Sequence, residues 1–214
     1  MTTPTNLWQA VFFDFDGVIA ASLEVKVRAF TTLFAPYGPV VQDEVICYHR
    51  ANGGMPRHLK LRYCLEVIAG KSIDDQELAQ MGHNFADLVQ EEVVAAPLIN
   101  GALSTLEQLK NSSIPTFVVS GTPQDEMRSI VVRKGLQPYF TEVHGSPRTK
   151  TEIIGDIMSR FPFTPESCLF IGDALADYRA AIATGLQFLG IIPQGQPSIF
   201  PDGVVIASKV SLHT

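Results

Sequence analysis

Short apolar runs alternate with longer amphipathic segments over most of the chain. Apolar runs bounded by polar residues are typical of strands that are buried on both faces of a parallel sheet. The segments between the later runs carry apolar residues at helical spacing. We therefore expect strands at residues 10–13, 114–120, 141–144, 168–172 and 188–192, a candidate edge strand at 204–207, and helices at 102–110, 124–134, 149–160 and 174–183.

The first and second expected strands are separated by a block with helical spacing alone. Its expected helices are 23–34, 41–48, 57–69 and 74–94. Elsewhere, alternation of strands and helices predicts an α/β fold with a doubly wound, Rossmann-like parallel sheet. The block is then an all-helical cap inserted over the sheet edge where such folds bind ligands. We predict a core domain of residues 1–21 and 95–214 and a cap domain of residues 22–94.

Composition places the chain among soluble globular proteins. Of its 214 residues, 46% are hydrophobic and 18% charged, and the formal net charge is −6. The acidic balance disfavours nucleic-acid and anionic-membrane partners, and no apolar run approaches the ~18 residues of a membrane-spanning helix. The segment 1–6 lacks the Lys or Arg that starts a signal peptide. Cys47, Cys64 and Cys168 are far apart in the sequence, so we expect their side chains to be reduced. Together these features predict a cytoplasmic protein.

Two carboxylates follow the first strand directly, in Phe13-Asp14-Phe15-Asp16-Gly17. The period of a strand would direct Asp14 and Asp16 to the same side. Two neighbouring carboxylates repel each other unless a cation or a proton compensates. The pair therefore predicts a metal site, an acid/base pair, or a nucleophile beside its acid. The alternative is a simple strand end and turn, where Asp and Gly are common.

Polar residues also follow the second strand, in Ser120-Gly121-Thr122. A hydroxyl and a small residue before a helix suit an oxyanion, which Ser120 and nearby backbone amides would bind. The alternative is a Ser/Thr N-cap. Lys150 opens a later helix, where a cation opposes the helix dipole unless a phosphate binds there. Alone, Lys150 is more often a solvated side chain, and Arg148 competes for its role.

A further acid follows the strand at 168–172. Asp173 comes directly after Gly172, and Asp177 lies four residues further on. The two acids suit an N-cap and the first turn of the next helix. A further acid at the same sheet edge would, however, concentrate carboxylate oxygens, which are ligands that suit Mg²⁺. We therefore expect a magnesium ion at this edge.

Taken in order, Asp-x-Asp, Ser-Gly-Thr, Lys and Gly-Asp-x-x-x-Asp resemble the four motifs of the haloacid dehalogenase superfamily. The resemblance covers nearly the whole chain, because the helical block is similar to the C1 cap that this superfamily inserts after its first strand. The most similar branch is that of the phosphoglycolate phosphatases and β-phosphoglucomutases. The resemblance implies an enzyme, a Mg²⁺-dependent phosphatase that hydrolyses a small phosphorylated metabolite.

The resemblance also implies the catalytic and metal-binding roles. Asp14 would be the nucleophile that forms an aspartyl-phosphate. Asp16 would be the general acid for the leaving group and then the base for water. Asp14, the backbone carbonyl of Asp16, and Asp173 would hold Mg²⁺.

Phosphate binding is implied for the remaining motif residues. Ser120, Gly121 and Lys150 would hold the phosphoryl oxygens and offset their charge. Asp177 would orient Lys150 or a metal-bound water. In the cap, the segment 52–57 resembles a substrate-specificity loop. Arg57 is a candidate for binding a second anionic group of the substrate, and an exposed Arg at a helix start is the alternative.

Two positions depart from the superfamily's pattern. Ala20 and Ala21 stand where an acid often precedes Ser22, and Lys26 stands near the place of a cap-hinge His in the mutases. Without that His we expect hydrolysis, with a β-phosphoglucomutase-type sugar phosphate mutase as the alternative. A non-catalytic binding protein on the same fold is a second alternative. No obligate protein partner is evident from the sequence.

Two other activities of the superfamily are disfavoured. A dehalogenase does not need the acid that Asp16 supplies to a leaving group. A phosphonatase would need a Schiff-base lysine in the cap, for which Lys60 and Lys71 have no supporting motif.

Overall fold

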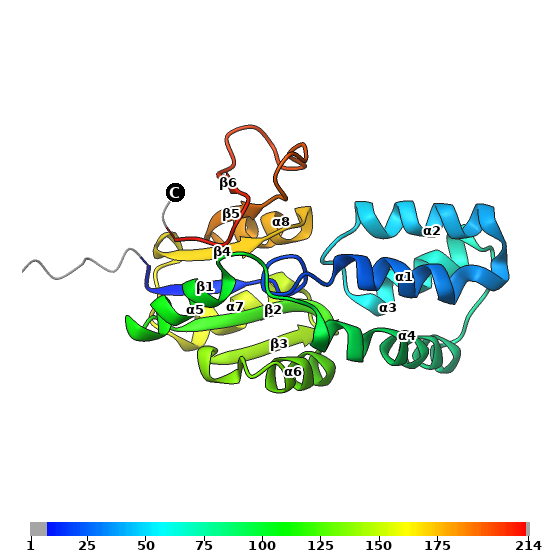
Figure 1. Ribbon diagram of the computed structural model, residues 1–214, viewed down its shortest axis with the longest axis horizontal. Helices are drawn as coiled ribbons and strands as arrows, with labels where there is room; N and C mark the ends of the chain where they lie inside the picture. Colours follow the sequence, from blue (N-terminus) through cyan, green and yellow to red (C-terminus); the bar gives the residue numbers. More distant parts are fainter. Residues whose placement is uncertain (1–7, 213–214) are drawn as a thin grey trace, which may run out of the picture.

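A parallel six-stranded sheet forms the centre of the computed structural model, which describes residues 8–212 (Figure 1). Across the sheet the strand order is β3-β2-β1-β4-β5-β6. The strands are β1 (Ala10–Phe13), β2 (Thr116–Pro123), β3 (Glu142–Ser146), β4 (Cys168–Gly172), β5 (Gln187–Ile191) and β6 (Ile206–Ala207). This confirms the predicted α/β fold with a parallel sheet. Residues 1–6, on which the signal-peptide expectation rests, lie outside the described residues.

Helices cover both faces of the sheet because successive residues of its strands point to opposite faces. In β1, Val11 and Phe13 pack in the cluster that includes α5 (Ala102–Asn111) and α6 (Gln124–Arg133). Ala10 and Phe12 pack in a second cluster with residues of α7 and α8. The latter helices are α7 (Lys150–Arg160) and α8 (Leu175–Thr184). All four side chains of β1 are fully buried, as the apolar run predicts.

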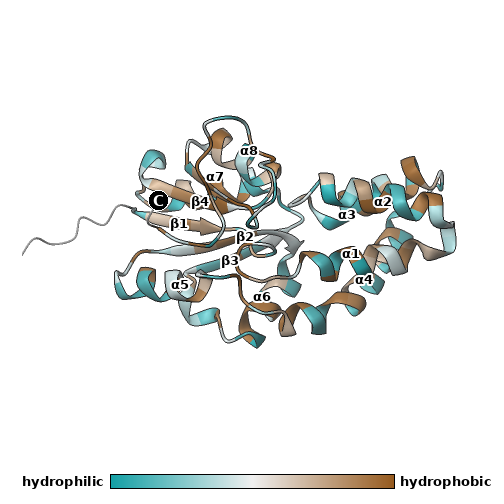
Figure 2. Ribbon diagram, turned by 45° about the horizontal axis from the view of Figure 1, so that its top comes forward, coloured by the Kyte–Doolittle hydropathy of each residue, from teal (hydrophilic) through white to brown (hydrophobic). Residues whose placement is uncertain are grey.

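The inserted block is helical throughout and lies beyond the carboxyl ends of the strands (Figure 1). Its principal helices show both hydrophilic and hydrophobic residues along their length (Figure 2). Three buried aromatic side chains, Phe30, Phe34 and Phe85, form its centre. The ring of Phe30 packs against both others, and its centroid lies 4.9 Å from that of Phe85. The elements are α1 (Leu23–Phe34), η1 (Ala35–Tyr37), α2 (Pro39–Ala51), α3 (Arg57–Tyr63), the π-helix η2 (Cys64–Ile68) and α4 (Asp75–Ala95).

Two connections join the helical block to the sheet, and they lie side by side. The amide of Ala21 donates to the carbonyl of Pro97 at 2.9 Å, and Ala20 forms an antiparallel bridge with Leu98. The boundaries 1–21, 22–94 and 95–214 stay a prediction. Within the described residues, no helix has the length and apolar character needed to cross a membrane. Two short 3₁₀ helices, η3 (Gln137–Tyr139) and η4 (Pro165–Ser167), complete the fold.

Candidate active site

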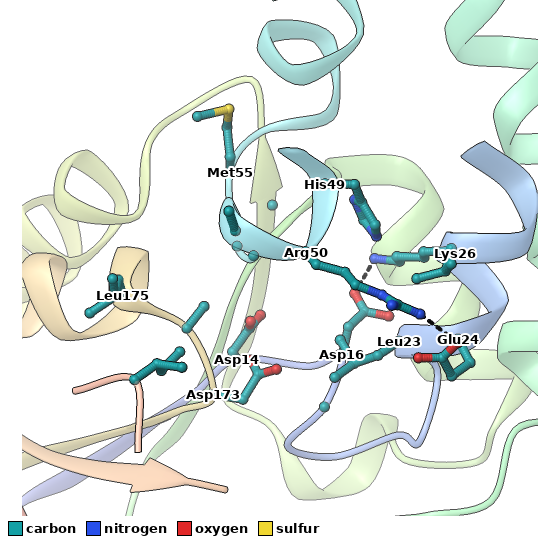
Figure 3. A pocket seen from close by; sticks show the side chains of 18 of the residues that line it. Asp14, Asp16, Leu23, Glu24, Lys26, His49, Arg50, Met55, Asp173 and Leu175 are labelled. Carbon is teal, nitrogen blue, oxygen red and sulfur yellow. Dashed lines mark hydrogen bonds and ion pairs between the residues drawn. The ribbon is translucent and has the colours of Figure 1, made fainter. Parts of the chain in front are cut away.

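A cavity of about 570 Å³ lies at the carboxyl edge of the sheet and is lined by both the sheet and the helical block. Figure 3 shows Asp14 and Asp173 close together at this cavity and Asp16 turned toward Lys26. Of the residues that the sequence assigns to the site, those lining the cavity are Asp14, Asp16, Arg57, Gly121 and Asp173. Those buried but outside the lining are Ser120, Lys150 and Asp177.

Asp14 directly follows β1 and is held by both its backbone and its side chain. Its amide donates to the carbonyl of Ile171 in β4 at 2.9 Å. Its Oδ1 accepts a hydrogen bond from the amide of Phe15 at 2.7 Å, and its Oδ2 lies 2.9 Å from Nζ of Lys150. The residue is only 3% exposed. A carboxylate fixed in this way at a cavity wall can attack a bound electrophile without prior reorganisation.

Lys150 lies between two carboxylates. Its Nζ pairs with Asp14 and with Oδ1 of Asp177, while Oδ2 of Asp177 accepts the amides of Asp173 and Ala174. Burial alone would lower the pKa of Lys150, but the two carboxylates outweigh it and raise that pKa. Lys150 is therefore a fixed cation, and its ammonium contacts the carboxylate of Asp177.

The competing cation, Arg148, lies elsewhere. Its guanidinium hydrogen-bonds Nδ1 of His144 at 2.9 Å and lies 3.5 Å from Asp156, with 41% of its side chain exposed. Thr149 caps α7 by accepting the amide of Glu152, which leaves Lys150 as the first residue of the helix. Of the two cations, Lys150 is the one that lies beside Asp14.

Asp16 has a separate set of partners. Ser22 Oγ donates to Oδ1 at 2.5 Å, while Lys26 Nζ and Thr122 Oγ1 both donate to Oδ2. Burial raises the pKa of Asp16, but Lys26 and the two hydroxyls outweigh burial, so the pKa is lowered. Because β1 ends at Phe13, the period of a strand does not set the directions of Asp14 and Asp16, but both carboxylates line the same cavity.

The residues around Asp16 were only partly visible in the sequence. Lys26 departs from the superfamily's pattern, but nothing in the sequence indicates its ion pair with Asp16. Nor does the sequence indicate the hydrogen bonds of Ser22 and Thr122 to Asp16. Thr122 links two elements, because its Oγ1 also accepts from Nζ of Lys26 at 2.9 Å.

Three carboxylates gather beside the single ammonium of Lys150. Asp14, Asp173 and Asp177 can each place one oxygen within 4.8 Å of the others. Burial and the neighbouring carboxylates raise the pKa values of Asp14 and Asp173. A divalent cation would relieve this repulsion, and hard oxygen donors suit Mg²⁺. The residues present therefore fit such an ion.

Gly17 explains how the Asp173 carboxylate reaches this cluster. The backbone of Gly17 has φ +82°, and a Cβ there would lie 2.3 Å from Oδ2 of Asp173. Only glycine allows both that conformation and that approach. The N-cap of α8 is Ala174 rather than Asp173, so the simple N-cap interpretation of Asp173 is wrong.

Ser120 and Gly121 lie inside β2, which continues to Pro123 beyond the predicted end at residue 120. The N-cap of α6 is Pro123, so the interpretation of Ser120 as an N-cap is wrong. Ser120 Oγ instead accepts the amide of Thr122 at 3.1 Å. Gly121 meets the helical block directly, since a Cβ there would lie 2.7 Å from the carbonyl oxygen of Gly54.

Arg57 lines the cavity but is already paired. Its two terminal nitrogens lie 2.7 and 2.6 Å from the carboxylate oxygens of Glu126, and its guanidinium stacks over Phe85 at 4.5 Å. The side chain is 8% exposed, so the interpretation of Arg57 as an exposed residue at a helix start is wrong. Binding of a second substrate anion by Arg57 stays a prediction.

The chain is similar in sequence to two phosphatases and in structure to a β-phosphoglucomutase. The chain is 22% identical over 191 residues to a phosphoglycolate phosphatase from Pasteurella multocida, covering 86% of this chain and 85% of the relative. It is 25% identical over 189 residues to a phosphorylated carbohydrates phosphatase from Thermotoga maritima, covering 84% and 82%. A β-phosphoglucomutase from Clostridium difficile superposes with a TM-score of 0.72 at 19% identity, covering 86% and 84%.

A family model extends over most of the chain. The haloacid dehalogenase-like hydrolase family matches residues 11–191, a range that includes every candidate site residue described above. Its span runs from β1 to the end of β5. The resemblance drawn from the four motifs is therefore confirmed, and the chain belongs to the haloacid dehalogenase-like hydrolase family.

Proposed function

We propose that the protein is a Mg²⁺-dependent phosphatase that hydrolyses a small phosphorylated metabolite through a phosphorylated Asp14. The proposal is carried by the position of Asp14, a buried carboxylate at the end of the central strand and at the wall of the cavity. Lys150 offsets its charge on one side, and Asp173 lies on the other. Two relatives, a phosphoglycolate phosphatase and a phosphorylated carbohydrates phosphatase, support the substrate class.

In the first half-reaction, a carboxylate oxygen of Asp14 attacks phosphorus, and the bond from phosphorus to the leaving-group oxygen breaks. Asp16 reacts in its protonated form, which is the minor form because Lys26 lowers its pKa, and gives its proton to that oxygen, so the alcohol leaves as a neutral molecule. In the second, a water oxygen attacks phosphorus and Asp16 takes the water's proton. The bond between Asp14 and phosphorus then breaks, which releases inorganic phosphate and restores Asp14.

Lys26 assists the second half-reaction. Its ammonium favours the ionised form of Asp16, and that form is the one that accepts a proton from water. Lys150, Ser120 and the backbone of Gly121 would hold the phosphoryl oxygens. Asp177 keeps the Lys150 ammonium in place for this purpose.

Asp14, the backbone carbonyl of Asp16, and Asp173 would hold the magnesium ion. When bound, Mg²⁺ offsets the negative charge of the phosphoryl group and of the carboxylates around it. We also propose that residues 22–94 act as a cap domain over the core formed by 1–21 and 95–214. The proposed setting is the cytoplasm, with no nucleic acid, membrane or obligate protein partner.

Hydrolysis of p-nitrophenyl phosphate, with and without Mg²⁺, tests the proposal directly. We expect activity that requires the metal and is abolished by Asp14→Asn. Asp43→Asn is the matched control, because Asp43 is exposed on α2 and does not line the cavity. Full activity of the Asp14→Asn protein would show that the nucleophile is another residue.

Asp16→Asn separates the two half-reactions. An aryl leaving group needs little protonation, so the first half-reaction should still proceed, while the second loses its base. We expect a phosphorylated protein to accumulate with p-nitrophenyl phosphate and to be detected as a mass increase. Asp14→Asn combined with Asp16→Asn should remove that increase, and its persistence would exclude Asp14 as the site of attachment.

A further inference from the structure

Lys60 is a buried cation in the wall of the active-site cavity. It lies on α3 of the helical block, is 4% exposed, and lines the cavity together with Asp14 and Asp16. The proposed phosphatase mechanism gives it no role. Its partner is Nδ1 of His49, 3.2 Å from Nζ.

His49 does not neutralise the positive charge of Lys60. Burial, assisted by Lys60 and Lys26, lowers the pKa of His49 to about 3, so its ring is neutral at physiological pH. The ring packs on Phe30 with centroids 4.4 Å apart. A neutral ring held in this way accepts one N–H of Lys60 through Nδ1 and fixes the direction of the ammonium, while the positive charge stays unbalanced.

The other cations that line the cavity each have a carboxylate partner. Lys26 pairs with Asp16, Arg57 with Glu126, and Arg50 lies 3.6 Å from Glu24. Among the lining residues that the structure describes, Lys60 is the cation without such a partner. Burying an ammonium without an anion is costly. Accordingly, burial first and Lys26 next lower the pKa of Lys60 to about 7.

We propose that Lys60 binds a second anionic group of the substrate, a carboxylate or a second phosphate, at the cap wall of the cavity. The proposal rests on the proposed phosphatase function and narrows its substrate class to phosphomonoesters that carry another anion. Such a group would complete an ion pair of which the protein supplies one half. It would also raise the pKa of Lys60 and so keep the ammonium protonated.

The volume of the cavity is consistent with a substrate that extends beyond its phosphate. Its 570 Å³ falls within the range of ordinary metabolite sites. Arg57 is less suited to this role because Glu126 already occupies its two terminal nitrogens. Lys60 is therefore better placed than Arg57 to bind the second anionic group of the substrate.

Matched pairs of phosphate esters test the proposal by competitive inhibition of p-nitrophenyl phosphate hydrolysis. The first pair is 2-phosphoglycolate and ethyl phosphate, which differ in a carboxylate. The second is glucose 1,6-bisphosphate and glucose 1-phosphate, which differ in a phosphate. In at least one pair we expect the wild type to bind the ester with two anionic groups about 30-fold more tightly than the ester with one, as a hydrogen bond between charged groups predicts. The pair that shows this ratio identifies the anion.

Lys60→Met should reduce that ratio to near one, and Lys60→Arg should retain most of it because the cation is preserved. Lys71→Met is the matched control, because Lys71 is an exposed lysine of the same helical block that does not line the cavity. A wild-type ratio near one in both pairs would overturn the proposal. An unchanged ratio in the Lys60→Met protein would do the same.

Two further outcomes are distinguishable. A buried lysine amine can instead attack a carbonyl carbon to form an imine with loss of water. Trapping by borohydride of an adduct between Lys60 and dihydroxyacetone phosphate, which carries a ketone, absent in Lys60→Arg, would overturn anion binding in favour of that chemistry. Failure of the wild type to hydrolyse p-nitrophenyl phosphate with Mg²⁺ would instead contradict the proposed function. The ratios would then be measured as dissociation constants by calorimetry, with the same criteria for Lys60.

Discussion

Arg57 on α3 and Glu126 on α6 form a bidentate ion pair that joins the helical block to the helices of the sheet. Both side chains are about nine-tenths buried. The planar guanidinium matches the carboxylate with two parallel hydrogen bonds, an arrangement that a lysine cannot reproduce. The pair therefore fixes the distance and the orientation between the two parts at the mouth of the cavity.

Removing one partner of this pair should destabilise the protein strongly. Glu126→Gln leaves the Arg57 charge buried and uncompensated, so we expect the free energy of unfolding in urea to fall by about 3 kcal/mol. Glu91→Gln is the control, because the Glu91–Arg133 pair also joins these two parts but is exposed, and should cost less than about 1 kcal/mol. Equal losses in the two variants would show that burial of the Arg57 pair contributes nothing.

Asp173 should determine the dependence of activity on Mg²⁺. Asp173→Asn removes one carboxylate from the acidic cluster, and we expect the half-maximal Mg²⁺ concentration to rise at least about tenfold. The measurement is a Mg²⁺ titration of p-nitrophenyl phosphate hydrolysis. A variant with an unchanged Mg²⁺ midpoint would mean that Asp173 holds no metal.

Any sugar phosphate that the enzyme accepts as a substrate should be hydrolysed and not isomerised. A mutase must protect its phosphorylated Asp from water until a sugar hydroxyl arrives, and a gating His assists this in the related mutases. Here Lys26 occupies that position and holds Asp16 ionised, which leaves it ready to activate water. NMR of an incubation with β-glucose 1-phosphate should show no glucose 6-phosphate, and any turnover should appear as free phosphate. Glucose 6-phosphate forming faster than phosphate would favour the mutase.

Lys60 should make the stability of the protein rise with pH. Burial, and next Lys26, lower its folded-state pKa from 10.5 to about 7. Between these values the unfolded state holds more protons than the folded state. The contribution of Lys60 to the free energy of unfolding therefore increases with pH, by at most about 1.4 kcal/mol per pH unit.

Urea unfolding of the wild type and of Lys60→Met at pH 7, 8 and 9 measures this contribution. Lys60→Met should be more stable than the wild type at pH 7, and its advantage should shrink as the pH rises. A gain in stability that accompanies a loss of anion selectivity is expected of a residue retained for binding. An advantage that did not change with pH would mean that the amine titrates normally in the folded protein.

Much of the sheet could be predicted from the sequence because its strands are buried on both faces. The runs at 10–13 and 168–172 match β1 and β4, since continuous apolar stretches allow few other placements. The boundaries of helices and strands were less predictable where the backbone changes its hydrogen-bonding pattern without a change in amino-acid composition. The expected helix 57–69 divides into α3 and the π-helix η2, and β2 continues past a register shift between Val119 and Pro123.

The candidate site was predictable where local motifs carry it. Asp14 and Asp173 follow apolar strands, so their places at the sheet edge follow from the pattern alone. The pairing of charges was not predictable, because it joins residues far apart in the chain. Glu126, for example, lies 69 positions from Arg57 in the sequence. Lys60 differs from the other cations that line the cavity only in lacking a carboxylate partner, and the sequence does not show which cations have one.

The amide of Asp14 donates to the carbonyl of Ile171 in the middle of the sheet. Opening of the helical block leaves that bond intact, since both residues belong to the sheet side of the molecule. Exchange of this amide with solvent deuterium thus requires unfolding of the central strands, whereas amides at the cavity mouth exchange through smaller openings. We therefore expect the amide of Asp14 to be among the most slowly exchanging in the protein, so that its carboxylate stays in place while the helical block opens.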